Sequence, residues 1–127
     1  MGNWPKAKPK YGNKKVTFRG IVFASKKERD YYLLLKDRER KGEISDLRLQ
    51  VRYELLPAIY EDEVVHLKTK DKIVPKLVQR KVEYVADFVY TENGTERVID
   101  TKGFRTKEYQ LKKKMMRSLL NIEIIEI

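Results

Sequence analysis

The sequence of 127 residues contains no cysteine and only one histidine, His66. Without cysteine, the chain can form neither a disulfide framework nor a thiolate zinc site, and one histidine cannot build a multi-histidine metal cage. Any metal site must therefore consist of carboxylates. We interpret His66 as an ordinary loop residue, because it has no second histidine with which to bind a metal.

Long apolar runs are also missing. No run approaches the roughly 20 residues that a bilayer-spanning helix needs, and residues 1–15 lack the apolar stretch of a secretory signal. We therefore expect a soluble, intracellular protein with no membrane partner. The length is that of a single domain with one core, which we place at residues 16–127.

Acidic residues are scarce in two segments of the chain. Lys and Arg number 29 against 19 Asp and Glu, which gives a net charge of +10. Residues 1–19 contribute +6 and residues 104–117 contribute +5, whereas residues 20–103 are nearly neutral. Clustered positive charge favours a nucleic-acid partner, and residues 1–15 are predicted to form a flexible basic arm. A solvated lysine-rich surface is the alternative explanation for each block.

Periodicity and local signals predict both helices and strands. Residues 16–23 are expected to form a short strand pair or one bent strand. A helix is expected over 26–41, strands over 47–55, 82–90 and 95–102, a second helix from Thr106 to about 120, and a final strand over 121–127. The second helix is expected to bury a stripe of Leu111, Met115 and Leu119. Residues 61–79 show no clean periodicity and are predicted to be a loop with at most one short strand, near residues 64–68.

The Asn93-Gly94 dipeptide is the strongest hairpin signal in the chain. A two-residue turn there sets a register in which Asp87 and Asp100 lie directly opposite each other on one face. Two carboxylates in that position repel each other unless a cation or a shared proton compensates. Oxygen-only ligation suits Mg²⁺, or Mn²⁺ in its place. A shift of one residue in the turn would put the aspartates on opposite faces, and each taken alone is also explained as a turn or edge residue.

Lys102 follows Asp100 by two residues and therefore projects from the same face of the strand. A lysine in that position can hold a scissile phosphate, orient the attacking water and stabilise charge that develops on phosphorus. Gly103 ends the strand and frees space beside Lys102, or serves only as a turn glycine.

These residues resemble the motif of the PD-(D/E)xK nuclease superfamily: a helical Glu28, then Asp87, then Asp100-Thr101-Lys102 on the next strand. Four strings resemble more specifically a small phage and prophage family of endonucleases related to Holliday-junction resolvases. They are Lys10-Tyr11-Gly12-Asn13-Lys14-Lys15, Phe23-Ala24-Ser25-Lys26-Lys27-Glu28, Tyr84-Val85-Ala86-Asp87-Phe88-Val89-Tyr90 and Asp100-Thr101-Lys102-Gly103-Phe104. Ala86 stands where the superfamily consensus has proline.

The resemblance implies an α/β fold with a restriction-endonuclease-like core, in which two helices flank a central mixed β-sheet. It also implies catalytic roles for Glu28, Asp87, Asp100 and Lys102. The implied metal ligands are Glu28, Asp87, Asp100 and the backbone carbonyl of Thr101. For Glu28 a structural role is the alternative, because Ser25 and Glu28 have the spacing of a capping box. Gln50 is either a further polar group at the site or an outward-facing residue.

We expect the basic residues that flank the motif to contact DNA. They are Lys14, Lys15, Arg105, Lys107, Lys112 and Lys113. Tyr109 lies on the same helix, and a solvated helix face is the alternative for its basic residues.

Together, these features predict a Mg²⁺-dependent DNA endonuclease of phage or prophage origin, located in the cytoplasm of a bacterial host. Branched DNA such as a Holliday junction is the favoured substrate, and the two cuts that a junction needs suggest a homodimer. A non-catalytic nucleic-acid-binding module on the same fold is the alternative. An RNA- or ribosome-associated basic protein explains the charge but not the opposed aspartates.

Overall fold

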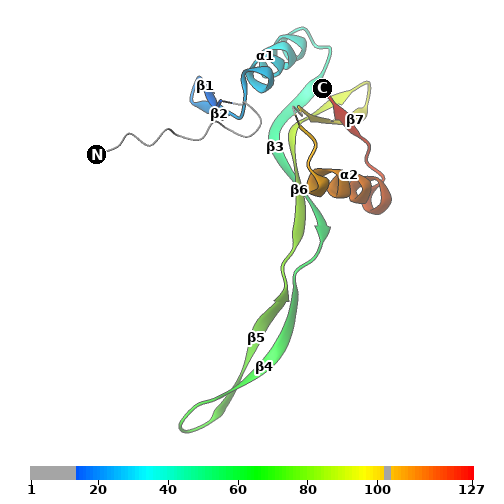
Figure 1. The fold of residues 1–127 in the computed structure, drawn as a ribbon. Helices are drawn as coiled ribbons and strands as arrows, with labels where there is room; N and C mark the ends of the chain where they lie inside the picture. The colour runs from blue at the N-terminus through cyan, green and yellow to red at the C-terminus, as the bar shows by residue number, and fades with distance from the viewer. Residues whose placement is uncertain (1–13, 102–103) are drawn as a thin grey trace, which may run out of the picture.

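The computed structural model describes residues 14–101 and 104–127, so most of the basic arm, Lys102 and Gly103 lie outside the described residues. Its elements in chain order are β1 (Val16–Phe18), β2 (Ile21–Phe23), α1 (Lys26–Arg40), β3 (Ser45–Leu56), β4 (Ile59–His66), β5 (Asp71–Gln79), β6 (Val82–Glu92), β7 (Thr95–Asp100), α2 (Lys107–Leu120) and β8 (Ile124–Glu126) (Figure 1). The main sheet has the strand order β3-β6-β7-β8 and is mixed, because only β7 and β8 run parallel. The expected mixed α/β fold is confirmed.

Both helices begin at the predicted capping residues. The Ser25 hydroxyl accepts a hydrogen bond from the backbone N–H of Glu28 at 3.2 Å, and the Thr106 hydroxyl accepts one from that of Tyr109 at 3.0 Å. Each bond satisfies a backbone donor that has no partner within the first helical turn. Neither described helix is long and apolar enough to cross a membrane.

The turn at Asn93-Gly94 sets the predicted register. Both residues have positive φ, 51° and 75°, as a two-residue type I′ hairpin turn requires. The hairpin pairs Glu92 with Thr95 and continues in step to Phe88 and Ile99. Asp87 and Asp100 are the next positions along the two strands.

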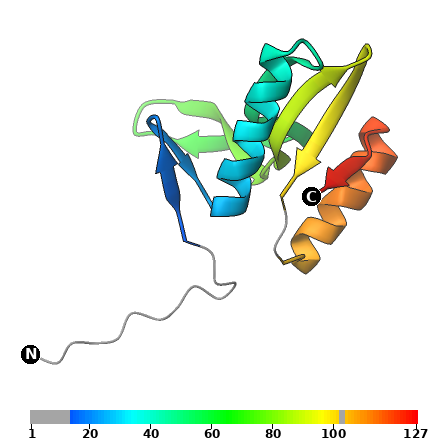
Figure 2. The same ribbon diagram turned by 90° about the horizontal axis from the view of Figure 1, so that it is seen from above.

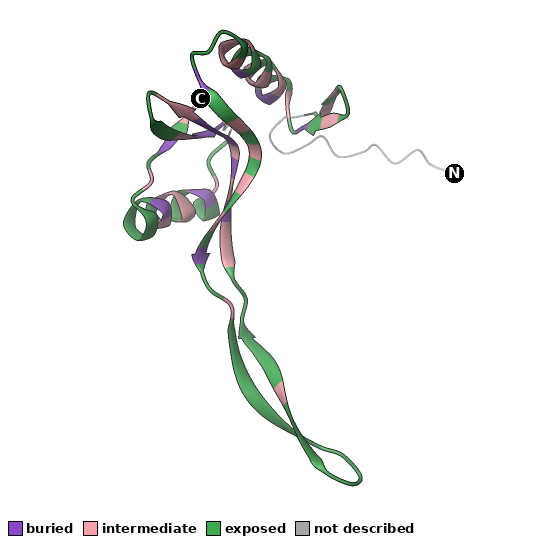
Figure 3. Ribbon diagram, turned by 180° about the vertical axis from the view of Figure 1, so that it is seen from behind, coloured by how far each residue is buried: buried purple, intermediate pink, exposed green. Residues whose placement is uncertain are grey.

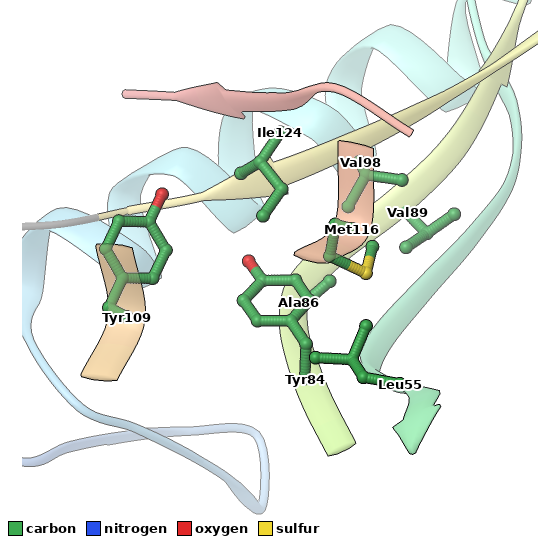
Figure 4. Packing of buried hydrophobic residues seen from close by; sticks show 8 residues of the cluster. All are labelled: Leu55, Tyr84, Ala86, Val89, Val98, Tyr109, Met116 and Ile124. Atoms are coloured by element: carbon green, nitrogen blue, oxygen red, sulfur yellow. The ribbon is translucent and has the colours of Figure 1, made fainter. Parts of the chain in front are cut away.

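The helices pack against two separate apolar clusters, one on each face of the main sheet (Figure 2). The α1 cluster consists of Phe23, Leu35, Ile44, Phe88, Tyr90 and Ile99. The α2 cluster consists of Leu55, Tyr84, Ala86, Val89, Val98, Tyr109, Met116 and Ile124 (Figure 4). The neighbouring residues Val98 and Ile99 belong to different clusters, as alternation along a strand requires.

Strands β3 and β6 change faces together at Gln50 and Asp87. On β3, Leu49 packs against the α1 cluster but Val51 packs against the α2 cluster, although residues two apart on a strand normally share a face. On β6 the same change separates Ala86 from Phe88. Gln50 has a φ of 51°, and this left-handed backbone reverses the alternation. The strict alternation of apolar and polar residues over 47–55 predicts a strand with one buried face, and this prediction is wrong because alternation cannot reveal the reversal.

Residues 61–79 were predicted to be mainly loop, and the structure corrects this. Strands β4 and β5 form a long two-stranded ribbon that extends away from the rest of the molecule (Figures 1 and 3). Nearly all of its residues are exposed. Because neither face of the ribbon lies against the core, its apolar residues were not required at every second position. The periodicity of the sequence is therefore weak there.

The predicted apolar stripe of α2 is also wrong. The buried residues of the helix are Tyr109 and Met116, whereas Leu111 and Leu119 are 59% and 53% exposed and only Met115 of the predicted stripe packs against the core. Figure 4 shows Met116 near Ala86 in the α2 cluster. The helix is therefore rotated from the predicted orientation, so that Tyr109 lies beside Tyr84.

We expect Met116→Ala to lower the free energy of unfolding by about 2–5 kcal/mol, because it leaves a cavity in a fully buried site. Leu119→Ala is the matched control on the exposed side of the same helix and should change stability by less than about 0.5 kcal/mol. Denaturant unfolding followed by circular dichroism measures both values. A larger effect at Leu119 would contradict the observed orientation of α2.

Candidate functional site

Glu28 lies in the first turn of α1 and is almost completely buried. One of its carboxylate oxygens accepts a hydrogen bond from the backbone N–H of Ala24 at 3.3 Å, so the side chain fixes the chain just before the N-cap residue Ser25. Its other oxygen accepts a hydrogen bond from the Gln50 amide at 3.4 Å. The Ser25 half of the predicted capping box is therefore confirmed, whereas the Glu28 carboxylate accepts from Ala24 in place of Ser25 and also faces Gln50.

Gln50 connects Glu28 to Asp87. Its amide nitrogen lies 3.4 Å from an oxygen of each carboxylate, so the two NH₂ protons serve both acids. The left-handed backbone of Gln50 costs about 1–2 kcal/mol for a residue with a Cβ atom. Strain of this kind is often retained at functional sites. The structure thus brings Glu28, Gln50 and Asp87 together from three distant parts of the sequence.

Asp87 also anchors the end of β7. Its second oxygen accepts hydrogen bonds from the backbone N–H of Thr101 at 2.9 Å and from the Thr101 hydroxyl at 2.8 Å. Thr101 is therefore at the site, and it contributes two donors to Asp87. The predicted role of its carbonyl as a metal ligand stays a prediction.

Asp100 is completely buried on the α2 side of the sheet. One of its oxygens accepts a hydrogen bond from the hydroxyl of Tyr84, which belongs to the α2 cluster. Burial, and then the nearby Asp100 carboxylate, raise the pKa of the Tyr84 phenol well above its usual range. The phenol consequently remains a hydrogen-bond donor at neutral pH and holds the carboxylate in place.

The oxygen ligands near the point where β3 and β6 change faces are compatible with a hard cation such as Mg²⁺. Among residues 14–101 and 104–127, no three His, Asp or Glu side chains lie close enough together to form a metal cage. Mg²⁺ does not need such a cage, because it is commonly held by one or two carboxylates and keeps several waters. Asp87 and Asp100 supply oxygen ligands only, and His66 lies away from them in the β4–β5 ribbon.

Tyr84 and Glu126 were missed in the sequence analysis. Tyr84 looked like one more strand aromatic, since its partner Asp100 is 16 residues away and lies on another strand. Glu126 accepts a hydrogen bond from Arg105 at 2.5 Å and also pairs with Lys113. No local pattern links these residues, because β8 joins the sheet only through tertiary pairing with β7.

The predicted DNA-contacting residues do not all have the same environment. Lys14 and Lys15 are exposed just before β1, and Lys107 is exposed at the start of α2. Lys112 pairs with Glu108 at 3.0 Å, while Arg105 and Lys113 both pair with Glu126. Tyr109 is buried and packs beside Tyr84, so it does not belong to an exposed binding face.

The fold and the cluster define a mixed α/β protein with carboxylates gathered where two strands change faces. The chain belongs to the family described as "Protein of unknown function (DUF1064)", whose model matches residues 8–123. No curated protein and no solved structure matches the chain.

The ion pairs of Glu126 predict a pH-dependent contribution to stability. Hydrogen bonds from Lys113, and then Arg105, lower the pKa of Glu126 below its ordinary value of 4.5. A lowered folded-state pKa stabilises the protein above pH 4.5, and this stabilisation is lost as the pH falls through the folded-state value. Glu126→Gln should therefore cost up to about 1 kcal/mol at neutral pH, and its difference from wild type should shrink in acid.

Thermal or denaturant unfolding of both proteins between about pH 7 and about pH 3, a range that includes the ordinary carboxyl pKa, measures this difference. Glu123→Gln is the matched control, because Glu123 is far more exposed and its ion pair with Arg117 is long, at 3.8 Å. Equal pH profiles for the two variants would contradict the assigned role of Glu126.

Proposed function

We propose that this protein is a metal-dependent DNA endonuclease that hydrolyses phosphodiester bonds, with branched DNA as its favoured substrate. The observation that carries the proposal is the convergence of Glu28 and Asp87 on the Gln50 amide, at the point where β3 and β6 change faces. Glu28 and Asp87 stand at positions that the resemblance to the PD-(D/E)xK superfamily implies. Asp100 and Thr101 are neighbours of the same cluster.

In this proposal, Asp87 and Asp100 hold Mg²⁺, with Glu28 and the Thr101 carbonyl completing or supporting the site. Bound Mg²⁺ would lower the pKa of a water and polarise the scissile phosphate. Gln50 and Tyr84 keep the carboxylates oriented through the hydrogen bonds that they donate. Lys102 lies outside the described residues, and its proposed role is to bind the scissile phosphate and stabilise developing charge.

The excess of positive charge supports a polyanionic substrate. The net charge is +10, and it is concentrated at residues 1–19 and 104–117. Lys14, Lys15 and Lys107 are exposed and available for phosphate contacts. Such contacts provide affinity without sequence specificity.

A non-catalytic nucleic-acid-binding module is the second candidate. It is favoured by the protein partners that the carboxylates already have, since both oxygens of Asp87 accept hydrogen bonds from Gln50 or Thr101. Carboxylates whose oxygens all accept hydrogen bonds from the protein can serve a purely structural role. The two candidates differ in whether metal turns DNA binding into cleavage.

Asp87→Ala should abolish cleavage and retain DNA binding, because it removes a proposed metal ligand without changing the basic surface. The measurement incubates each protein with linear, flapped and four-way DNA in Mg²⁺, Mn²⁺ or EDTA. Asp30→Ala is the control at an exposed aspartate of α1 and should cleave like wild type. Full activity of Asp87→Ala, or activity of wild type in EDTA, would refute the metal mechanism, and binding without any cleavage by wild type would support the second candidate.

Lys102→Ala should reduce turnover by several orders of magnitude while it leaves Mn²⁺ affinity unchanged, because lysine provides no ligand to a cation. Calorimetric titration with Mn²⁺ separates binding from chemistry. If Lys102→Ala loses as much Mn²⁺ affinity as Asp100→Ala does, the role assigned to Lys102 is wrong.

A further inference from the structure

The β4–β5 ribbon has two different faces. Directly paired residues of antiparallel strands share a face, and the pairs alternate along the ribbon. One face, here called the apolar face, carries Tyr60, Asp62, Val64, His66, Asp71, Ile73, Pro75 and Leu77. The opposite face carries Glu61, Glu63, Val65, Lys72, Val74 and Lys76. The ribbon is therefore amphipathic.

The apolar face is strongly exposed. Tyr60 is 61% exposed, Val64 52%, Ile73 66% and Leu77 44%. Each strand packs extensively only against the other, and the ribbon extends beyond the core in Figure 3. A hairpin of two strands is at best marginally stable in water without a further layer. Contiguous exposed apolar surface of this kind usually marks an interaction site.

The charge of the ribbon does not favour nucleic acid as its partner. Residues 59–79 carry four basic and four acidic side chains, so the ribbon is neutral in a chain with a net charge of +10. Glu61 lies directly opposite Lys76, which balances charge within the ribbon itself. The apolar face contains two aspartates, Asp62 and Asp71, which would repel a phosphate backbone.

We propose that the apolar face of the ribbon binds the same face of a second copy of this chain. Its residues are self-complementary about the Val64–Ile73 pair. If two ribbons stack with a two-fold axis through that pair and perpendicular to the strands, Asp62 of each copy lies against His66 of the other. Val64 and Ile73 of the two copies then pack against each other at the centre of the contact, as in two packed sheets.

His66 is already oriented for this contact. Its Nδ1 atom lies 2.8 Å from an oxygen of Asp71, the residue directly opposite it on β5. This contact fixes the imidazole ring on the apolar face, and the second ring nitrogen can approach Asp62 of the other copy. A surface that brings an acid against a base under two-fold symmetry is what an isologous dimer requires. The proposal does not depend on the proposed nuclease function.

The first test compares Val64→Asp with Val65→Asp by sedimentation over a range of protein concentrations. Wild type and Val65→Asp should form dimers, because Val65 lies on the opposite face across from Lys72. Val64→Asp should weaken dimerisation roughly tenfold or more, since it places a charge at the centre of the apolar contact. Unchanged far-ultraviolet circular dichroism and thermal unfolding establish that the core of each variant is intact.

A second test uses the absence of cysteine in the chain. Packed sheets lie about 10 Å apart, which is too far for a disulfide but within reach of a short bis-maleimide. Val64→Cys should be cross-linked into a covalent dimer in dilute solution, whereas Val65→Cys should not.

Three results would overturn the proposal: monomeric wild type at every concentration, equal weakening by both aspartate variants, or equal cross-linking of both cysteine variants. Loss of DNA binding in Val64→Asp, with wild type and variant both monomeric, would assign the ribbon to nucleic acid instead.

Discussion

The reversal of β3 and β6 at Gln50 and Asp87 is the constraint on which the rest of the fold depends. Because both strands change faces at the same point, the apolar side chains on one side of that point pack against α1. Those on the other side pack against α2. One strand pair can therefore anchor two helices on opposite faces of the sheet. The left-handed backbone at Gln50 costs about 1–2 kcal/mol, and burial of both clusters offsets that cost.

The same reversal creates the environment of the candidate site. Where regular pairing changes face, Gln50 and Asp87 are available to each other and to Glu28 from α1. Buried carboxylates are tolerated only when hydrogen bonds or charges compensate their loss of hydration. Asp100 satisfies this condition through the Tyr84 phenol, whose raised pKa keeps its proton available. The carboxylates are consequently fixed by the surrounding protein before anything binds to them.

Two surfaces of the molecule differ in chemistry. The segments around β1 and α2 are basic, although Glu126 neutralises part of the charge by pairing with Arg105 and Lys113. The β4–β5 ribbon is neutral and exposes apolar side chains on one face. The proposed polyanionic substrate is assigned to the first surface, and the proposed contact with a second copy of the chain is assigned to the second. This division explains why the charge of the whole chain does not predict what the ribbon binds.

Local signals in the sequence determined the elements and one long-range register. The caps at Ser25 and Thr106 set the helix starts, and the Asn93-Gly94 turn set the pairing of β6 with β7, because each depends on residues close in sequence. In this register Asp87 and Asp100 directly follow the Phe88–Ile99 pair. Both could therefore be proposed as site residues from the sequence. Glu28 could be proposed as well, although only the fold shows that one carboxylate accepts hydrogen bonds both from the Ala24 N–H just before α1 and from Gln50.

Tertiary structure alone decided the remaining features, because they join residues with no local relation. The change of face at Gln50 depends on a backbone conformation that glutamine rarely adopts, so the regular alternation of β3 concealed it. The orientation of α2 was set by packing of Tyr109 and Met116 against β6, not by the apolar spacing of its own residues. The β4–β5 ribbon lacked a periodic signal because no core covers it. The spacing of apolar residues indicates which side chains face the core. It carries little information where a strand changes the face that it buries, or where no core covers the strand.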